Sequence, residues 1–442
     1  MRYLAIIASL LLPTVAQGAN NNVQTSVGAD FSTIGHYRTD SDFDPTERYY
    51  DTDGQSSGQL ASFLRTRLGL EKLAEGNPHL SLLHEMELGW NAWGGADPSQ
   101  PDAFNEMASA GLNLRHRQLW AQVALSSHTS LKAGFQEIKD PSGLFLDHLG
   151  GGFTLTVRGS GSETSILAGQ LPEQTLEGVS IGDDNFVTDS LVAGGHVKLV
   201  RAVSSFDLAA YLLHDERAID RPIDLATVVA GFETKLGATQ LWMHALGQYG
   251  KWANSGIGGI DQNISSWATQ LGMTQPVMRG SWSLRALVLS GDDAYDGNNH
   301  LGAFLGSGKN RSASKILTED ENRDRYDNLD ERMATNLGSL FLNTAGLAVI
   351  DGSIVLPVNE DYAQSMVIAG GWNLNPDNAM GHQFVGTELE WTQTWTIQKD
   401  AALFVTVQIF QPGKAAAVFV NDVDRTATEA VYGAQLGFQA RF

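Results

Sequence analysis

Cysteine is absent from the 442 residues, which excludes disulfide bonds, thiolate metal sites and cysteine nucleophiles together. Charged residues are also sparse, at 18 % of the chain, against roughly 25 % in an average soluble domain. Basic residues are fewer than acidic ones, with 29 Lys and Arg against 50 Asp and Glu. This acidic balance argues against nucleic acid as a partner, because phosphate contacts need a basic surface.

Long hydrophobic runs are absent beyond the N-terminus. The first residues place Arg2 before an apolar run, Tyr3–Leu12, and then small residues up to Gly18. This order is typical of a secretory signal peptide, so we expect residues 1–18 to be a signal peptide and 19–442 to form a single exported domain. No later run approaches the ~18–20 apolar residues that a membrane-spanning helix needs.

Instead, the chain contains many segments of alternating polarity. The C-terminal stretch VYGAQLGFQARF sets Phe438 and Leu436 on one side, and Gln439 and Gln435 on the other. Alternate side chains of a strand point to opposite faces, and about ten residues of alternation between turns are typical of a transmembrane barrel strand. We count roughly eighteen such segments between Val23 and Phe442, which predicts an all-β, antiparallel transmembrane β-barrel of about 16–18 strands. A soluble β-sandwich also alternates, but it would seldom keep an apolar face on so many segments.

The last residue, Phe442, ends an apolar-faced strand, as in the assembly signal of bacterial outer-membrane barrels. We therefore expect it to be read by the barrel-assembly machinery, and the last strand to close against the first, near Val23–Phe31. The predicted location is the outer membrane, with lipid and lipopolysaccharide around the barrel. Tryptophans near segment ends are expected in the aromatic girdles, namely Trp90, Trp93, Trp120, Trp242, Trp282, Trp372, Trp391 and Trp395.

Signals for catalysis, metals or cofactors are weak. The stretch from Asp40 to Asp44 has acids at alternate positions, but Pro45 stands where a calcium loop needs glycine, so a solvated loop is the better interpretation. Neither an H-E-x-x-H pair nor a G-x-S-x-G elbow occurs, and His214-Asp215-Glu216 is the only tight acid–histidine cluster. We therefore predict no enzyme activity, no catalytic residues, no metal site and no cofactor.

The polar face of the strands is the expected working surface. Opposed charges across a pore select ions and charged solutes, although the same charges can simply pair between neighbouring strands. Arg65 and Arg67 with Glu85 and Glu87 are candidates for such pairing. The predicted luminal cations are Arg65, Arg67, Arg115, Arg117, Arg158, Lys198 and Arg285, and the luminal anions are Glu71, Glu85, Glu87, Asp207, Glu233, Glu388 and Glu390.

Several stretches resemble the alginate-export family of bacterial outer-membrane β-barrel proteins. The resemblance rests on Leu119–Asp147, on the stretch AFLGSGKNRSASKIL with the following Asn322, Arg323 and Tyr326, on Val385–Gly413, and on the closing GAQLGFQARF. It implies an 18-stranded monomeric barrel that passes an anionic uronate polymer through an arginine-lined conduit, with loops as gates. It also implies a role for Arg323 in binding and, as a partner, a periplasmic polymer-synthesis complex.

The chain departs from that family at two places. Phe135 stands between Gly134 and Gln136 where the family has arginine, and Val405, Thr406 and Gln408 occupy the strand where the family has an inward arginine. The resemblance implies passage of an anionic polysaccharide or oligosaccharide. A diffusion porin for small solutes, general or substrate-specific, and a structural or adhesive barrel remain as alternatives.

Overall fold

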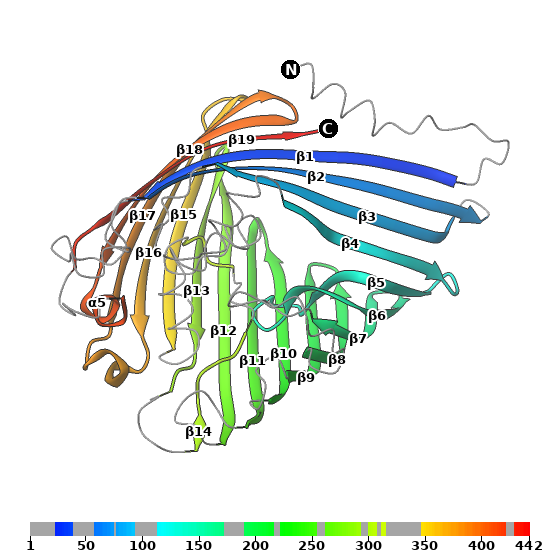
Figure 1. The fold of residues 1–442 in the computed structure, drawn as a ribbon, viewed down its shortest axis with the longest axis horizontal. Helices are drawn as coiled ribbons and strands as arrows, with labels where there is room; N and C mark the ends of the chain where they lie inside the picture. Colours follow the sequence, from blue (N-terminus) through cyan, green and yellow to red (C-terminus); the bar gives the residue numbers. More distant parts are fainter. Residues whose placement is uncertain are drawn as a thin grey trace.

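The structure is a computed structural model, and it describes residues 23–38, 57–74, 77–92, 113–171, 190–215, 222–253, 261–292, 299–306, 311–314, 346–420 and 428–442. The expected signal peptide, the acidic stretch from Asp40 to Asp44 and Arg323 lie outside these residues. Figure 1 shows the strands curving around a common interior, with the first and last strands side by side.

Eighteen long strands form the barrel wall. Their bounds are β1 Val23–Arg38, β2 Ser57–Ala74, β3 Asn77–Ala92, β4 Asn113–Ala124, β5 Thr129–Lys139, β6 Asp147–Gly159, β7 Ser162–Leu171, β8 Ser190–Arg201, β9 Ser204–Asp215, β10 Ile223–Leu236, β11 Thr239–Trp252, β12 Gln262–Val277, β13 Gly280–Leu289, β15 Leu347–Pro357, β16 Tyr362–Asn373, β17 Phe384–Gln398, β18 Ala401–Pro412 and β19 Val431–Arg441. The described part adds a two-residue strand, β14 (His300–Leu301), a 3₁₀ helix, η2 (Pro376–Ala379), and a short helix, α5 (Lys414–Val420). No helix among the described residues is long and apolar enough to cross a membrane.

The wall strands pair antiparallel with their neighbours and close into one barrel. β13 pairs directly with β15, because β14 leaves the wall and pairs parallel with β12. β1 pairs with both β2 and β19, and this pairing closes the sheet at the seam. A closed barrel satisfies the backbone hydrogen bonds between strands, which a lipid environment requires. The predicted fold class is confirmed.

Alternation along the strands separates a lipid face from a luminal face. On β9, Phe206, Leu208 and Leu212 are exposed on the outside, whereas Asp207 and Tyr211 are buried on the inside. β19 repeats the pattern, with exposed Tyr432 and Leu436. Large apolar side chains that are exposed on so many strands indicate a bilayer environment rather than water.

The two ends of the barrel differ in their connections. The strand bounds leave only two residues between β6 and β7, β8 and β9, β10 and β11, and β12 and β13. The connections at the other end are mostly longer, such as the one between β13 and β15. Outer-membrane barrels have short periplasmic turns and long extracellular loops, so the tight-turn end is the periplasmic end.

Three sequence expectations need correction. Trp120 was expected in an aromatic girdle, but it lies on the luminal face of β4, where its indole nitrogen donates to the Gln118 side chain at 3.0 Å. Trp242 was expected in an aromatic girdle, but it is buried on the luminal face of β11, where its ring lies 4.8 Å from the Arg311 guanidinium carbon. The closing strand was expected against Val23–Phe31, but β19 pairs with Asp30–Arg38. The part of β1 before Asp30 extends beyond the end of β19. Within that part, Ala29 exchanges two backbone hydrogen bonds with Phe442.

Candidate functional site

An arginine–glutamate ladder lines the inside of β2, β3 and β4. The strand register places Arg65 opposite Glu87 and Arg67 opposite Glu85. Arg65 Nη2 lies 2.8 Å from Glu87 Oε2, and Arg67 Nε donates to Glu85 Oε2 at 2.7 Å. Arg117 on β4 approaches Glu87 from the other side, at 3.8 Å. The cross-strand pairing that the sequence left open is therefore confirmed.

The cations of β2 and the carboxylates of β3 differ in their exposure. The side chains of Arg65 and Arg67 are 30 % and 53 % exposed, whereas those of Glu85 and Glu87 are 4 % and 6 % exposed. A solute in the lumen therefore meets guanidinium groups, while the carboxylates lie beneath them against the wall. Local charges decide the field in a narrow pore, since more distant ones are screened over ~8 Å.

The loop between β5 and β6, residues 140–146, folds into the lumen. Leu144, Phe145 and Leu146 are almost fully buried, and Phe145 lies against Tyr211 of β9 with ring centroids 6.1 Å apart. The Asp140 carboxylate organises the loop, because it accepts the backbone N–H groups of Ser142, Gly143, Phe145 and Leu146. Burial raises the pKa of this carboxyl group, and its hydrogen bonds oppose that shift.

A second luminal segment follows β14, and its described parts are residues 302–306 and 311–314. Ala303 and Phe304 are buried, and Leu305 is bonded through its backbone to the Gln248 side chain of β11. Ser312 donates to Asp351 of β15 at 2.8 Å, and Ser314 bonds to Glu388 of β17. This segment therefore spans the inside of the wall from β11 to β17.

Gln270 of β12 joins the two luminal segments. Its Nε2 donates to the Ser142 carbonyl oxygen at 2.8 Å, and its Oε1 accepts the Arg311 backbone N–H at 3.1 Å. The Arg311 guanidinium in turn pairs with Glu233 of β10 at 2.8 Å. One buried amide thus positions both segments against the same wall and narrows the lumen on the β9–β17 side.

Most of the other predicted charges also face the interior. Arg285 pairs with Asp351 at 2.7 Å, and here too the guanidinium is more exposed than the carboxylate. Asp207 accepts from His196 at 2.7 Å, and Lys198 lies opposite Asp207 in the register. Glu390 accepts from Gln408 at 3.0 Å and, like Glu388, is buried.

Some predicted luminal residues lie elsewhere. Arg158 pairs with Glu163 at 2.8 Å beside the tight β6–β7 turn, where both side chains are exposed, so it belongs to the periplasmic rim and not to a constriction. The reason is its position in β6, one residue before the strand ends. Glu71 is exposed near the periplasmic end of β2. Arg115 lies opposite Glu87 in the register, and its side chain is outside what the structure describes.

Sequence reasoning missed the residues that hold the luminal segments, above all Asp140, Gln248, Gln270 and Arg311. Neutral glutamines on a polar strand face carry no distinctive pattern. The run Asp140-Pro141-Ser142-Gly143 does carry a turn signal, because an aspartate two residues before a free N–H favours an Asx turn. That signal identifies a turn and gives no indication that it folds inward.

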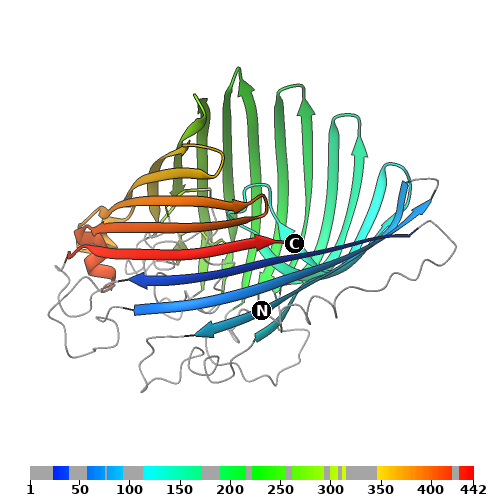
Figure 2. The ribbon, with the colours of Figure 1, turned by 90° about the horizontal axis from the view of Figure 1, so that it is seen from above.

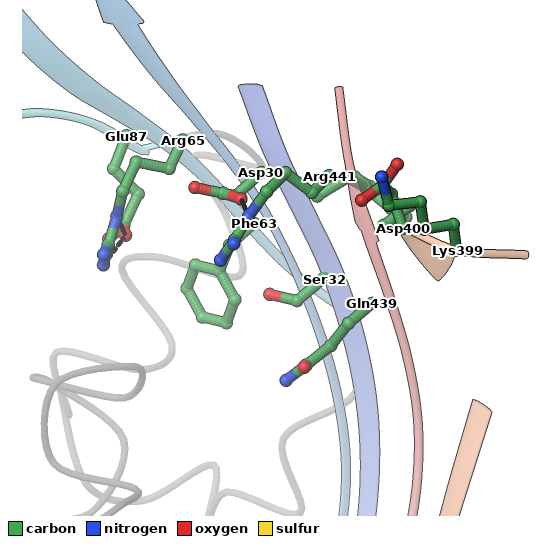
Figure 3. Close-up of a pocket in the computed structure, with 11 residues that line it drawn as sticks. Asp30, Ser32, Phe63, Arg65, Glu87, Lys399, Asp400, Gln439 and Arg441 are labelled. Carbon is green, nitrogen blue, oxygen red and sulfur yellow. Dashed lines mark hydrogen bonds and ion pairs between the residues drawn. The ribbon is translucent and has the colours of Figure 1, made fainter. Parts of the chain in front are cut away.

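A luminal cavity of about 370 Å³ lies beside the arginine ladder, near the barrel seam. Phe63, Arg65 and Glu87 line it from one side, and Gln439 and Arg441 from the other. Figure 3 shows the Arg65–Glu87 and Asp30–Arg441 ion pairs on its wall, the latter at 2.9 Å. The cavity shows that the β1–β3 and β19 side of the lumen is open next to exposed cations.

No known family profile and no curated protein matches the chain. Solved structures do resemble it across nearly the whole length. OccAB2 of Acinetobacter baumannii has a TM-score of 0.58 at 10 % identity, covering 95 % of this chain and 98 % of its own. OccK9 (OpdG) of Pseudomonas aeruginosa has a TM-score of 0.56 at 12 % identity, and the match covers 95 % of this chain and 99 % of OccK9. OccAB1 of Acinetobacter baumannii has a TM-score of 0.55 at 12 % identity, and the match covers 95 % of this chain and 96 % of OccAB1.

These comparisons overturn the expected family. The three structures named above are Occ porins and not alginate-export proteins, so the resemblance to the alginate-export family is wrong, and polysaccharide export is not supported. The motifs behind that resemblance are strand and turn patterns that large barrels have in common. The chain has the architecture of an outer-membrane porin, and the predicted outer-membrane location is confirmed.

Proposed function

We propose that the protein is a passive diffusion channel for small hydrophilic solutes, with a preference for anions. The observation that carries the proposal is the exposure of Arg65 and Arg67 above the buried Glu85 and Glu87. The Occ porins named above support the channel part of the proposal only by sharing the fold.

The luminal segments favour small solutes over a polymer. Residues 140–146 and 302–306 are held by buried side chains of β11 and β12, so they occupy interior space in the resting structure. A polymer chain would have to displace several backbone hydrogen bonds to pass, whereas a small solute can follow the open side along β2 and β3.

The net charge of −21 does not contradict anion preference. In two of the luminal pairs, Arg285–Asp351 and Arg65–Glu87, the carboxylate is the buried partner. Glu388 and Glu390 are buried as well. The negative charges of these groups therefore lie below the luminal surface that a solute contacts.

Liposome swelling tests the channel itself. Vesicles containing the protein should swell in isosmotic solutions of small sugars and amino acids, and the rate should fall steeply as solute size increases. Swelling that equals that of protein-free vesicles for all solutes would reject a channel and favour the structural barrel. Equal rates for a monosaccharide and a long oligosaccharide would reject the constriction.

A further inference from the structure

Three consecutive hairpins at the periplasmic end combine exposed cations with exposed apolar side chains. They join β8 to β9, β10 to β11 and β12 to β13, and their tips stand in a row in Figure 2. We define the basic hairpin row as Arg201, Val203, Lys235, Leu236, Met278 and Arg279, all of which are exposed.

The row is positive in a protein that is strongly negative. No Asp or Glu occurs within 200–204, 234–240 or 275–281. Among the described residues, none of its three cations forms an ion pair, in contrast to Arg158 and Arg441 at the same end. Solvated surface cations are common, but three neighbouring hairpins with cations and no acid form a continuous anion-attracting strip.

The row is continuous with the lipid-facing surface. Val197 and Leu199 are exposed on the outer face of β8, and Arg201 follows them at the next outward position. Leu236 ends the outer face of β10 in the same way. The hairpins therefore reach the level at which the acyl region of a bilayer meets its headgroups.

The backbone of the β12–β13 turn adds an independent observation. Met278 has a positive φ of 49° in a two-residue turn, a conformation that favours glycine, yet its side chain is fully exposed and contributes nothing to packing in the protein. A flexible apolar side chain in that position is explained if its surroundings outside the protein are apolar.

We infer that the basic hairpin row binds anionic phospholipids of the periplasmic leaflet. Arg201 and Arg279 would contact the phosphate groups, with Lys235 adding positive charge on the inner side of its hairpin, while Val203, Leu236 and Met278 would contact the adjoining acyl chains. A headgroup of net negative charge is required, because a zwitterionic lipid brings its own cation to the same surface. Juxtamembrane cations each contribute about a fivefold gain in affinity for an anionic membrane surface.

Native mass spectrometry of the detergent-solubilised protein, titrated with phosphatidylglycerol or phosphatidylcholine, measures this directly. The wild type should bind phosphatidylglycerol more tightly than phosphatidylcholine. The double variant Arg201→Gln/Arg279→Gln should bind it about 25-fold more weakly, which is the product of two fivefold losses. The matched control Lys251→Gln/Lys414→Gln removes two cations at the opposite end and should retain wild-type binding.

Met278→Gly separates lipid binding from folding. It relieves the backbone conformation, so the lipid-free barrel should melt at or above the wild-type temperature while phosphatidylglycerol binding weakens. Equal phosphatidylglycerol binding by the wild type and the Arg201→Gln/Arg279→Gln variant would overturn the proposal, as would an equal loss in the control. The proposal would also be overturned if inorganic phosphate alone displaced the lipid. It would be overturned likewise if Arg201 and Arg279 were needed for binding soluble peptidoglycan fragments but not for binding lipid.

Discussion

The side-chain amide of Gln248 pairs with the backbone of Leu305 as a neighbouring strand would. Its Nε2 donates to the Leu305 carbonyl oxygen at 2.7 Å, and its Oε1 accepts the Leu305 N–H at 3.0 Å. Ser266 donates to the same Oε1 at 2.8 Å, which fixes the orientation of the amide. A single buried side chain of the wall thus satisfies both backbone groups of a residue in the lumen.

Replacing Gln248 should loosen the luminal segment. Gln248→Leu leaves both Leu305 backbone groups without this partner, at a cost of about 2 kcal/mol to docking. Single-channel recordings should then show a noisier current with a larger mean conductance. Gln240→Leu, an exposed position on the same strand, is the control and should conduct as the wild type. Unchanged conductance in Gln248→Leu would mean that residues 302–306 do not limit the current.

Removing the carboxylate of Asp140 should release the loop between β5 and β6. Asp140→Ala removes the acceptor of four backbone N–H groups, so we expect a loss of about 3 kcal/mol of loop stability or more. Limited proteolysis should cut within 140–146 in this variant and spare the wild type. Asp377→Ala, at an exposed position of the 3₁₀ helix η2, should remain resistant. Equal resistance of the Asp140→Ala variant would show that packing of Leu144 and Phe145 alone holds the loop.

Neutralising the buried carboxylates of the ladder should strengthen anion preference. In Glu85→Gln/Glu87→Gln, the partly exposed Arg65 and Arg67 lose their counter-charges but keep contact with water, whereas the buried Arg117 loses Glu87 without that contact, so the barrel should lose about 3 kcal/mol of stability. The ratio of anion to cation permeability should rise above that of the wild type. Glu163→Gln, which frees Arg158 at the rim, should leave the ratio unchanged. An unchanged or lower ratio would show that Arg65 and Arg67 do not control the ions that pass.

The seam between β1 and β19 should depend on the backbone of Phe442 rather than on its ring. Phe442 and Ala29 exchange two backbone hydrogen bonds, at 2.8 and 3.1 Å. Deleting Phe442 removes both, and at about 1 kcal/mol each it should lower the temperature at which the folded band disappears in heat-modifiability gels. Phe442→Ala keeps both bonds and should melt close to the wild type once folded. If Phe442→Ala folds in vitro but fails to assemble in cells, the ring acts in assembly.

The barrel could be predicted because its strands follow one simple rule. Each wall strand separates lipid from lumen, so a period of two is written into segments such as Phe206–Leu212 and Tyr432–Phe438. Pairing of Arg65 and Arg67 with Glu85 and Glu87 was one of two interpretations left open by the sequence, because all four lie on the polar faces of adjacent strands; the register decided for it. Trp242 was misplaced because a tryptophan near a strand end suits the interface as well as the lumen, and only register decides between them.

The luminal segments could not be predicted from the same rule. Residues 140–146 and 302–306 have no alternation, and they are buried through partners more than 50 residues away, such as Gln270 for Ser142 and Gln248 for Leu305. Loops are ordinarily exposed, because buried backbone needs hydrogen-bond partners. Here glutamines of the wall supply those partners, and glutamine is equally common on polar faces that bind nothing.

The reversal potential across a planar bilayer under a salt gradient tests the central claim most directly, namely that solutes meet Arg65 and Arg67 and not the buried carboxylates. The sign of the reversal potential of the wild type should show that anions pass more readily than cations. Arg65→Glu/Arg67→Glu should reverse that sign. Arg158→Glu/Arg201→Glu, which changes the same number of charges at the rim, should keep it. Cation preference in the wild type, or an unchanged potential in Arg65→Glu/Arg67→Glu, would contradict the account.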